Sequence, residues 1–128
     1  MSLSKNIEDN LEQDLMEMAR IGYTDDGFEV YVNTDDGGNI PHFHYRVKGS
    51  WEFHTCIRLD KPEYFHHDGK EEVLNSKQRK NLIKFLNKFD DEEGKNNWQI
   101  LIAEWNRNNS NMKVDRNIPM PDYTQLKE

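Results

Sequence analysis

Two adjacent segments, 42–47 and 51–59, alternate between apolar and polar residues, and this alternation constrains the fold more than any other feature. Successive side chains of a β-strand point to opposite faces of its sheet, so each segment predicts a strand with one apolar face. The Lys-Gly-Ser sequence at 48–50 predicts the turn that joins them into an antiparallel hairpin. The polar face of this hairpin carries three histidines and the only cysteine of the chain, which are His42, His44, His54 and Cys56.

The turn also predicts which residues face each other across the hairpin. A one-residue slip would move every side chain to the other face, so a three-residue turn is favoured over a two-residue one. A pair of opposite charges, Arg46 and Glu52, suits this register. The expected pairs are Val47–Trp51, Arg46–Glu52, Tyr45–Phe53, His44–His54, Phe43–Thr55 and His42–Cys56.

Periodicity predicts the remaining elements of an α+β domain. Residues 28–33 form a further strand, so the sheet is a three-stranded antiparallel meander within 27–60. Apolar residues at helical spacing predict helices at 4–20, 76–89 and 96–108, followed by an extended tail at 110–128. Because each helix has one apolar stripe, about three helices should cover the apolar sheet face in two layers. The polar, histidine-bearing face is then expected to be left to solvent, a partner or a ligand.

Length and composition indicate the class of protein. A chain of 128 residues predicts a single domain, 1–128, that is large enough to fold without disulfides. One cysteine and the absence of a signal-like or membrane-spanning apolar run favour the cytoplasm and predict no membrane association. The net charge of −7 comes from an acidic first third of the chain, which disfavours non-specific binding to nucleic acid.

The polar face of the hairpin is the best candidate for chemistry. Imidazole and thiolate are the ligands that zinc accepts, and residues two apart on one strand or opposite on two strands lie close enough to share an ion. His42, His44, His54 and Cys56 are therefore candidate ligands for zinc or another transition metal. Side chains expected to orient them, or to complete the polar face, are Glu29, Tyr31, Arg46 and Glu52; one allowed register places Glu29 beside His44 and Tyr31 beside His42.

Other interpretations of these residues remain open. Without a metal, His44 beside Glu29 and His54 is an oriented imidazole suited to proton transfer, and Cys56 near His42 is a candidate nucleophile. The simplest alternative is a hydrated polar face on which histidine is tolerated. None of the motifs GxGxxG, P-loop, GxSxG and HExxH occurs in the chain, so no complete catalytic signature supports an enzyme.

A stripe of lysines offers a third kind of site. The helix expected at 76–89 carries these residues along one side, where they could contact phosphates. A solvated helix face explains the same pattern, and the acidic total charge disfavours nucleic acid as a partner. The stripe consists of Lys77, Lys80, Lys84 and Lys88.

The run Ile40-Pro41-His42-Phe43-His44-Tyr45, followed by Gly49 and another strand, resembles a group of short bacterial proteins of unknown function. Those proteins share a Pro-His-Phe-His strand start, and some are encoded beside toxin–antitoxin partners. The resemblance covers residues 27–60 and implies a small bacterial accessory protein. This chain departs from the group in its acidic amino-terminal segment and its tryptophan-containing last helix.

These observations favour a non-enzymatic protein-interaction or accessory module. Its expected contact surface, with a protein partner or a second copy, is the polar sheet face or the acidic first helix. The alternatives are a metal-dependent hydrolase or nuclease that uses the histidines of an exposed sheet face, and a nucleic-acid-linked regulator that uses the lysine stripe.

Overall fold

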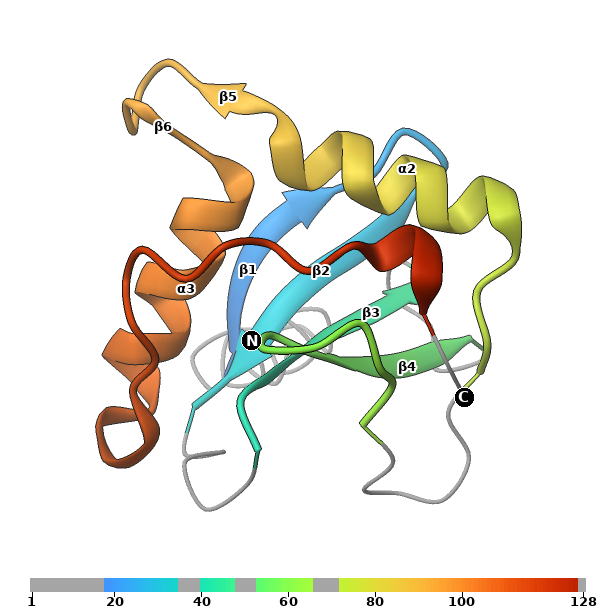
Figure 1. Cartoon of the computed structure of the whole chain (residues 1–128). Coiled ribbons are helices and arrows are strands. Elements are labelled where there is room, and N and C mark those ends of the chain that lie inside the picture. Colours follow the sequence, from blue (N-terminus) through green and yellow to red (C-terminus); the bar gives the residue numbers. More distant parts are fainter. Residues whose placement is uncertain (1–17, 35–39, 48–52, 66–71, 127–128) are drawn as a thin grey trace, which may run out of the picture.

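A four-stranded antiparallel sheet forms the centre of the structure, and its strands pair in sequence order (Figure 1). The structure is a computed structural model that describes residues 18–34, 40–47, 53–65 and 72–126. The α+β class is confirmed, but the sheet has one strand more than the three expected. The strands are β1 (Met18–Tyr23), β2 (Phe28–Asn33), β3 (His42–Val47) and β4 (His54–Arg58).

Two helices, α2 (Ser76–Asn87) and α3 (Asn97–Asn108), pack on one face of this sheet, as Figure 1 shows. A small hairpin of β5 (Phe89–Asp90) and β6 (Lys95–Asn96) separates them. Each helix is capped at its amino end by an asparagine, Asn75 or Asn96, which forms a capping box with the glutamine three residues later. Neither is long and apolar enough to cross a membrane, and the same holds for every helix in the described ranges.

The core confirms the predicted apolar sheet face. Alternate residues of β2, β3 and β4 point toward the helices, and their side chains are almost fully buried. Burial of aromatic and aliphatic side chains is the main favourable contribution to folding. The core includes Val30, Val32, Phe43, Tyr45 and Ile57 of the sheet, Leu82, Phe85 and Leu86 of α2, and Trp98, Leu101, Ile102 and Trp105 of α3.

The expected first helix is wrong at its carboxyl end. Residues 18–20 belong to strand β1, and residues 4–17 lie outside the described part of the chain. Gly22, two residues beyond the expected end of that helix, lies next to an irregularity in the pairing of β1 with β2. A Cβ added at Gly22 would come within 3.0 Å of the Phe85 ring. Pairing with β2 thus prevails over helical periodicity, which is a weak local preference.

The expected strand registers are wrong by two residues. His44 pairs with Cys56, Arg46 with His54, and His42 with Arg58. A bond from Val47 N–H to Phe53 O (3.2 Å) continues this register, so five residues rather than three connect the paired positions. A two-residue shift keeps every side chain on its face, so face parity did not exclude it.

Pairing between β2 and β3 is displaced in the same way. Glu29 lies opposite Arg46 and Tyr31 lies opposite His44. The expectation placed Glu29 beside His44 and Tyr31 beside His42. The observed pairing brings a carboxylate to a guanidinium and a phenol to an imidazole.

The carboxyl end of the helix expected at 76–89 differs from expectation. This helix ends at Asn87, and Phe89 lies in β5 with 59% of its surface exposed. Its amino-terminal cap is Asn75. The helix predicted at 96–108 is confirmed to within one residue.

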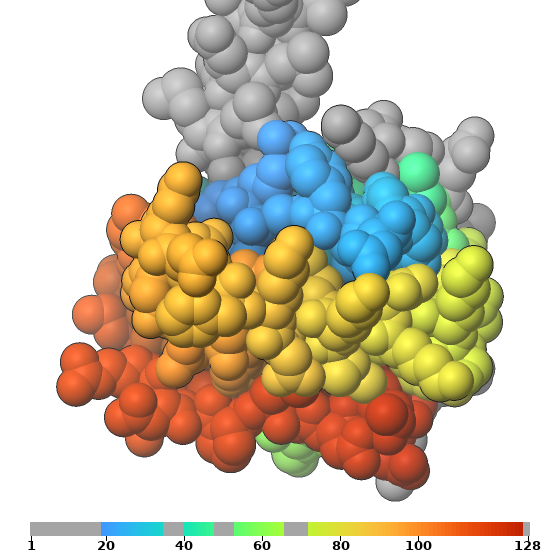
Figure 2. Space-filling model, turned by 90° about the horizontal axis from the view of Figure 1, so that it is seen from above, coloured from blue at the N-terminus to red at the C-terminus, as the bar shows by residue number. Residues whose placement is uncertain are grey.

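The carboxyl-terminal segment runs along α2 on the side away from β1, as Figure 2 shows. It is docked by a hydrogen bond from the Trp98 indole N–H to Ile118 O (2.9 Å) and one from the Tyr123 hydroxyl to Arg58 O (2.6 Å). Tyr123 is fully buried in the core. Burial raises the pKa of Tyr123 well above its ordinary value of 10.0.

We predict that replacing Tyr123 by Phe changes how stability depends on alkaline pH. A raised folded-state pKa makes folding more favourable below pH 10, and this contribution is lost as pH rises above that value. Tyr123→Phe should cost about 1–2 kcal/mol at neutral pH, because the Arg58 carbonyl loses its partner. Above pH 10 the difference from wild type should shrink.

Urea denaturation at neutral pH and above pH 10 measures both effects. Tyr23→Phe, at a half-buried tyrosine of β1, is the control for the loss of a tyrosine hydroxyl as such. Identical pH dependence in wild type and Tyr123→Phe would contradict the role given to this hydroxyl.

Candidate metal centre

The second face of the sheet is buried, which contradicts the expectation of an exposed histidine-bearing surface. His42 and Cys56 have no accessible surface, and His44 has 2%. His54, at the start of β4, is half-buried. Four side chains that can bind a metal therefore lie together in an enclosed environment, with His54 nearest to solvent.

Three of the ligand atoms form a compact triangle. The distances are 3.0 Å from His44 Nδ1 to His54 Nε2, 3.3 Å from His44 Nδ1 to Cys56 Sγ, and 3.9 Å from Cys56 Sγ to His54 Nε2. Cross-strand pairing of His44 with Cys56 produces the shortest sulfur contact, and the two-residue spacing of His54 and Cys56 puts both on the same face.

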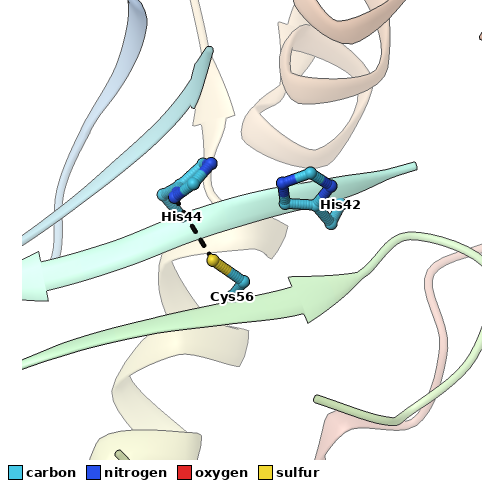
Figure 3. Close-up of side chains that lie close together, drawn as sticks. All are labelled: His42, His44 and Cys56. Atoms are coloured by element: carbon cyan, nitrogen blue, oxygen red, sulfur yellow. Dashed lines mark hydrogen bonds between the residues drawn. The ribbon is translucent and has the colours of Figure 1, made fainter. Parts of the chain in front are cut away.

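His42 joins this group from the same strand as His44. Its ligand atom lies within 4.8 Å of those of His44 and Cys56, and Figure 3 shows the three side chains close together, with the hydrogen bond between His44 and Cys56. His42 Nδ1 lies 2.7 Å from the carbonyl oxygen of Ile40. Because a carbonyl can only accept, Nδ1 carries the proton and Nε2 carries the lone pair that a metal needs.

The spacing suits a transition metal with nitrogen and sulfur ligands. In tetrahedral zinc sites, with Zn–N about 2.0–2.1 Å and Zn–S about 2.3 Å, neighbouring ligand atoms are about 3.3–3.8 Å apart. A circle through the three atoms of the triangle, whose sides are 3.0, 3.3 and 3.9 Å, has a radius of about 2 Å, close to one metal–ligand bond length. One point thus lies at bonding distance from all three atoms.

A stack of flat groups supports the ring of His44. Tyr31 lies parallel to it, with ring centroids 4.8 Å apart and an interplanar angle of 13°. The guanidinium of Arg46 lies over the Tyr31 ring, 4.9 Å from its centroid. The ring of His54 also stacks on that of His44, with centroids 5.3 Å apart and an interplanar angle of 23°. This column holds the imidazole in one plane, which orients its ligand atom.

A buried carboxylate fixes the end of the column. Glu29, only 1% exposed, accepts hydrogen bonds from Arg46 Nε (2.9 Å) and Arg20 Nε (3.1 Å). Buried carboxylates need such partners, since an unpaired charge is costly to remove from water. Of the four residues expected to orient the cluster, Glu29, Tyr31 and Arg46 lie in this network, and Glu52 lies outside the described residues.

Three further residues contribute to the cluster and were not predicted from the sequence. Asn33 Nδ2 lies 3.2 Å from His44 Nε2, and Arg20 of β1 was assigned to a helix. The ring of Phe65 packs against that of His42 at 4.8 Å, because the Phe65 N–H bonds to Cys56 O and places this loop beside β4. Asn33 was detectable, since it lies on the same strand face as Glu29 and Tyr31.

The lysine stripe is a separate, exposed feature. Lys77, Lys80 and Lys84 of α2 and Lys88, the residue that caps its carboxyl end, are exposed, and Lys84 Nζ pairs with the Asp25 carboxylate at 2.7 Å. This hydrogen bond holds the pKa of Asp25 below its usual range and raises that of Lys84. A groove of about 710 Å³ lies beside this pair, between β1, α2 and β5. Its lining, which includes Lys88 and Asp90, has both signs of charge.

Comparisons with known proteins identify no family for this chain. No protein-family model matches the chain. Searches of curated proteins and of solved structures likewise give no significant match.

We predict the tautomer of His44 in the metal-free protein. The Asn33 amide donates to His44 Nε2, so the ring proton should lie on Nδ1 and point toward His54 and Cys56. Long-range proton–nitrogen NMR correlations distinguish the two ring nitrogens. A proton on His44 Nε2 would contradict this arrangement and require the Asn33 amide to be turned. The variant Asn33→Leu should remove the preference for the Nδ1-protonated tautomer.

Proposed function

We propose that this protein is a small non-enzymatic accessory protein that holds one transition-metal ion between β3 and β4. The observation that carries the proposal is the triangle of His44, His54 and Cys56 ligand atoms at mutual distances of 3.0–3.9 Å. His42 is available as a further ligand. Such a mixed nitrogen and sulfur set suits zinc and the softer first-row metals.

Burial favours a holding role over hydrolysis. A catalytic metal keeps a position open for water and substrate, whereas three of these four side chains are at most 2% exposed. Metal binding in such an enclosed site contributes directly to folding stability. We therefore infer that the ion stabilises one conformation of the sheet, and that the loaded protein is the form that meets a protein partner.

The metal-binding proposal is tested by loading purified protein with Co(II) and measuring its absorption spectrum. One equivalent should bind, with a sulfur-to-cobalt charge-transfer band and intense visible bands typical of a four-coordinate site. Loss of a residue that hydrogen-bonds to a metal ligand costs 10–100-fold in metal affinity. Loss of a ligand itself should cost more, so Cys56→Ser and His44→Ala should each weaken Co(II) binding by at least about 100-fold.

A matched control lies between the two ligands of β4. Thr55 is buried and points to the opposite sheet face, so Thr55→Val should bind Co(II) as wild type does. Wild-type protein that binds no metal, or a Cys56→Ser variant with an unchanged cobalt spectrum, would refute the proposal.

Metal binding should also raise thermal stability. Free metal at 100 times its dissociation constant stabilises the folded state by about 2.7 kcal/mol, which corresponds to a Tm increase of roughly 10 °C for a chain of this size. Calorimetry with and without a chelator measures this shift. Equal Tm values for loaded and stripped protein would contradict a site formed only in the folded state.

A further inference from the structure

We infer that the ion enters and leaves this centre past His54, and that the loaded protein passes it to a partner protein which presents an imidazole or a thiolate. This inference rests on the proposed function, since it assigns an exchange route and a recipient to the same cluster. It follows from the different burial of the four side chains and from their positions along the two strands.

Burial divides the four side chains into two groups. His42 and Cys56 have no accessible surface and His44 has 2%, whereas His54 is half-buried. A donor atom that approaches from solvent therefore meets His54 before it meets the other three. His54 is accordingly the ligand that such a donor replaces first.

The strand positions explain this difference. Cys56 lies in the middle of β4, opposite His44, and the Phe65 N–H donates to its carbonyl oxygen at 2.9 Å. His54 is the first residue of β4 and lies opposite Arg46. A strand advances about 3.3 Å per residue, so His54 lies about 6–7 Å nearer to the end of the strand than Cys56 does.

His54 also reaches the cluster with the ring nitrogen that is farther from its backbone. Its Nε2 atom lies 3.0 Å from His44 Nδ1 and 3.9 Å from Cys56 Sγ. His44 faces the same point with Nδ1, the nitrogen nearer to its own backbone. Rotation of the His54 side chain therefore opens one coordination position at the ion and requires no movement of either strand.

The buried side chains retain the ion while this position is open. The ligand atoms of His42, His44 and Cys56 lie within 4.8 Å of one another, so a small inward rotation makes His42 the third ligand in place of His54. In the exchange step, the bond from the metal to His54 Nε2 breaks and its electron pair stays on the imidazole. A bond from the lone pair of the incoming donor forms, and no electron is transferred. The ion thus passes between ligands and is not released to water.

The recipient must offer donor atoms of the same kinds. Nitrogen and thiolate ligands suit zinc and the softer first-row metals, so a recipient with carboxylates alone would not draw the ion from this set. The donor must also reach past the half-buried His54. A partner that fits carries a histidine or cysteine on a projecting part of its surface.

Stopped-flow transfer of Zn(II) from the loaded protein to a chromophoric chelator with nitrogen donors, 4-(2-pyridylazo)resorcinol, tests the exchange step. The transfer rate should rise in proportion to the chelator concentration, because the incoming donor takes part in the step that displaces His54. A rate that does not depend on the chelator concentration would show that the ion leaves before any recipient binds.

Variants of the two groups should act differently on this rate. His54→Ala removes the bond that the recipient must replace, so transfer should be at least about tenfold faster, since a change at one contact acts mainly on dissociation. His42→Ala should add a release rate that is independent of chelator, because fewer buried ligands retain the ion. Thr55→Val, at a buried neighbour that points to the opposite sheet face, is the matched control and should exchange as wild type does.

Co(II)-loaded glycine variants test where a donor enters. In His54→Gly the thiolate of glutathione should bind at the vacated position and strengthen the sulfur-to-cobalt charge-transfer band. In His44→Gly, at a residue that is 2% exposed, a tripeptide should leave this band unchanged.

The outcomes separate this inference from the proposed function. Chelator-dependent transfer by wild type, together with a glutathione response in His54→Gly alone, supports the inference. A chelator-independent rate, or equal glutathione responses of the two glycine variants, overturns it and leaves metal binding intact. If a glycine variant fails to fold by circular dichroism, the wild-type transfer kinetics decide. Protein that binds neither Co(II) nor Zn(II) overturns both the inference and the proposed function.

Discussion

The alternation of side chains along β3, held by its pairing with β4, is the constraint on which the rest of the structure depends. It directs Phe43 and Tyr45 into the core beneath the helices and His42 and His44 to the opposite face. The same strand therefore contributes to folding energy and to the candidate metal centre. A one-residue change in register would exchange the two sets and bury the imidazoles among apolar side chains.

The second sheet face is an organised polar interior. Glu29 holds Arg46, Arg46 covers Tyr31, and Tyr31 stacks on His44. Each group in this series is kept in place by the next, so the ligand atoms are positioned before any ion arrives. Such preorganisation lowers the cost of binding, because few side-chain rotations are lost when the ion enters. It also explains why a polar set tolerates burial in a chain of only 128 residues.

Sequence patterns predicted the composition of each sheet face and the helix at 96–108, because both depend on local periodicity. They predicted that His42, His44, His54 and Cys56 share a face, and the structure brings them together. The predicted pairing partners were wrong, because a shift of two residues keeps every side chain on its face and only the length of the turn distinguishes the two registers. Strand β1 was missed because Met18 continues a helical stripe, and its strand conformation comes from pairing with distant β2. Burial of the cluster was not predictable from alternation, which is the same for a hydrated face and a covered one.

X-ray absorption spectroscopy of the metal-loaded protein identifies the atoms that bind the ion. We expect one sulfur at about 2.2–2.3 Å and two or three imidazole nitrogens at about 2.0 Å from the ion, with the sulfur contribution lost in Cys56→Ser. A spectrum that contains only nitrogen and oxygen neighbours, or a sulfur signal that survives Cys56→Ser, would contradict a metal centre built from the β3–β4 cluster.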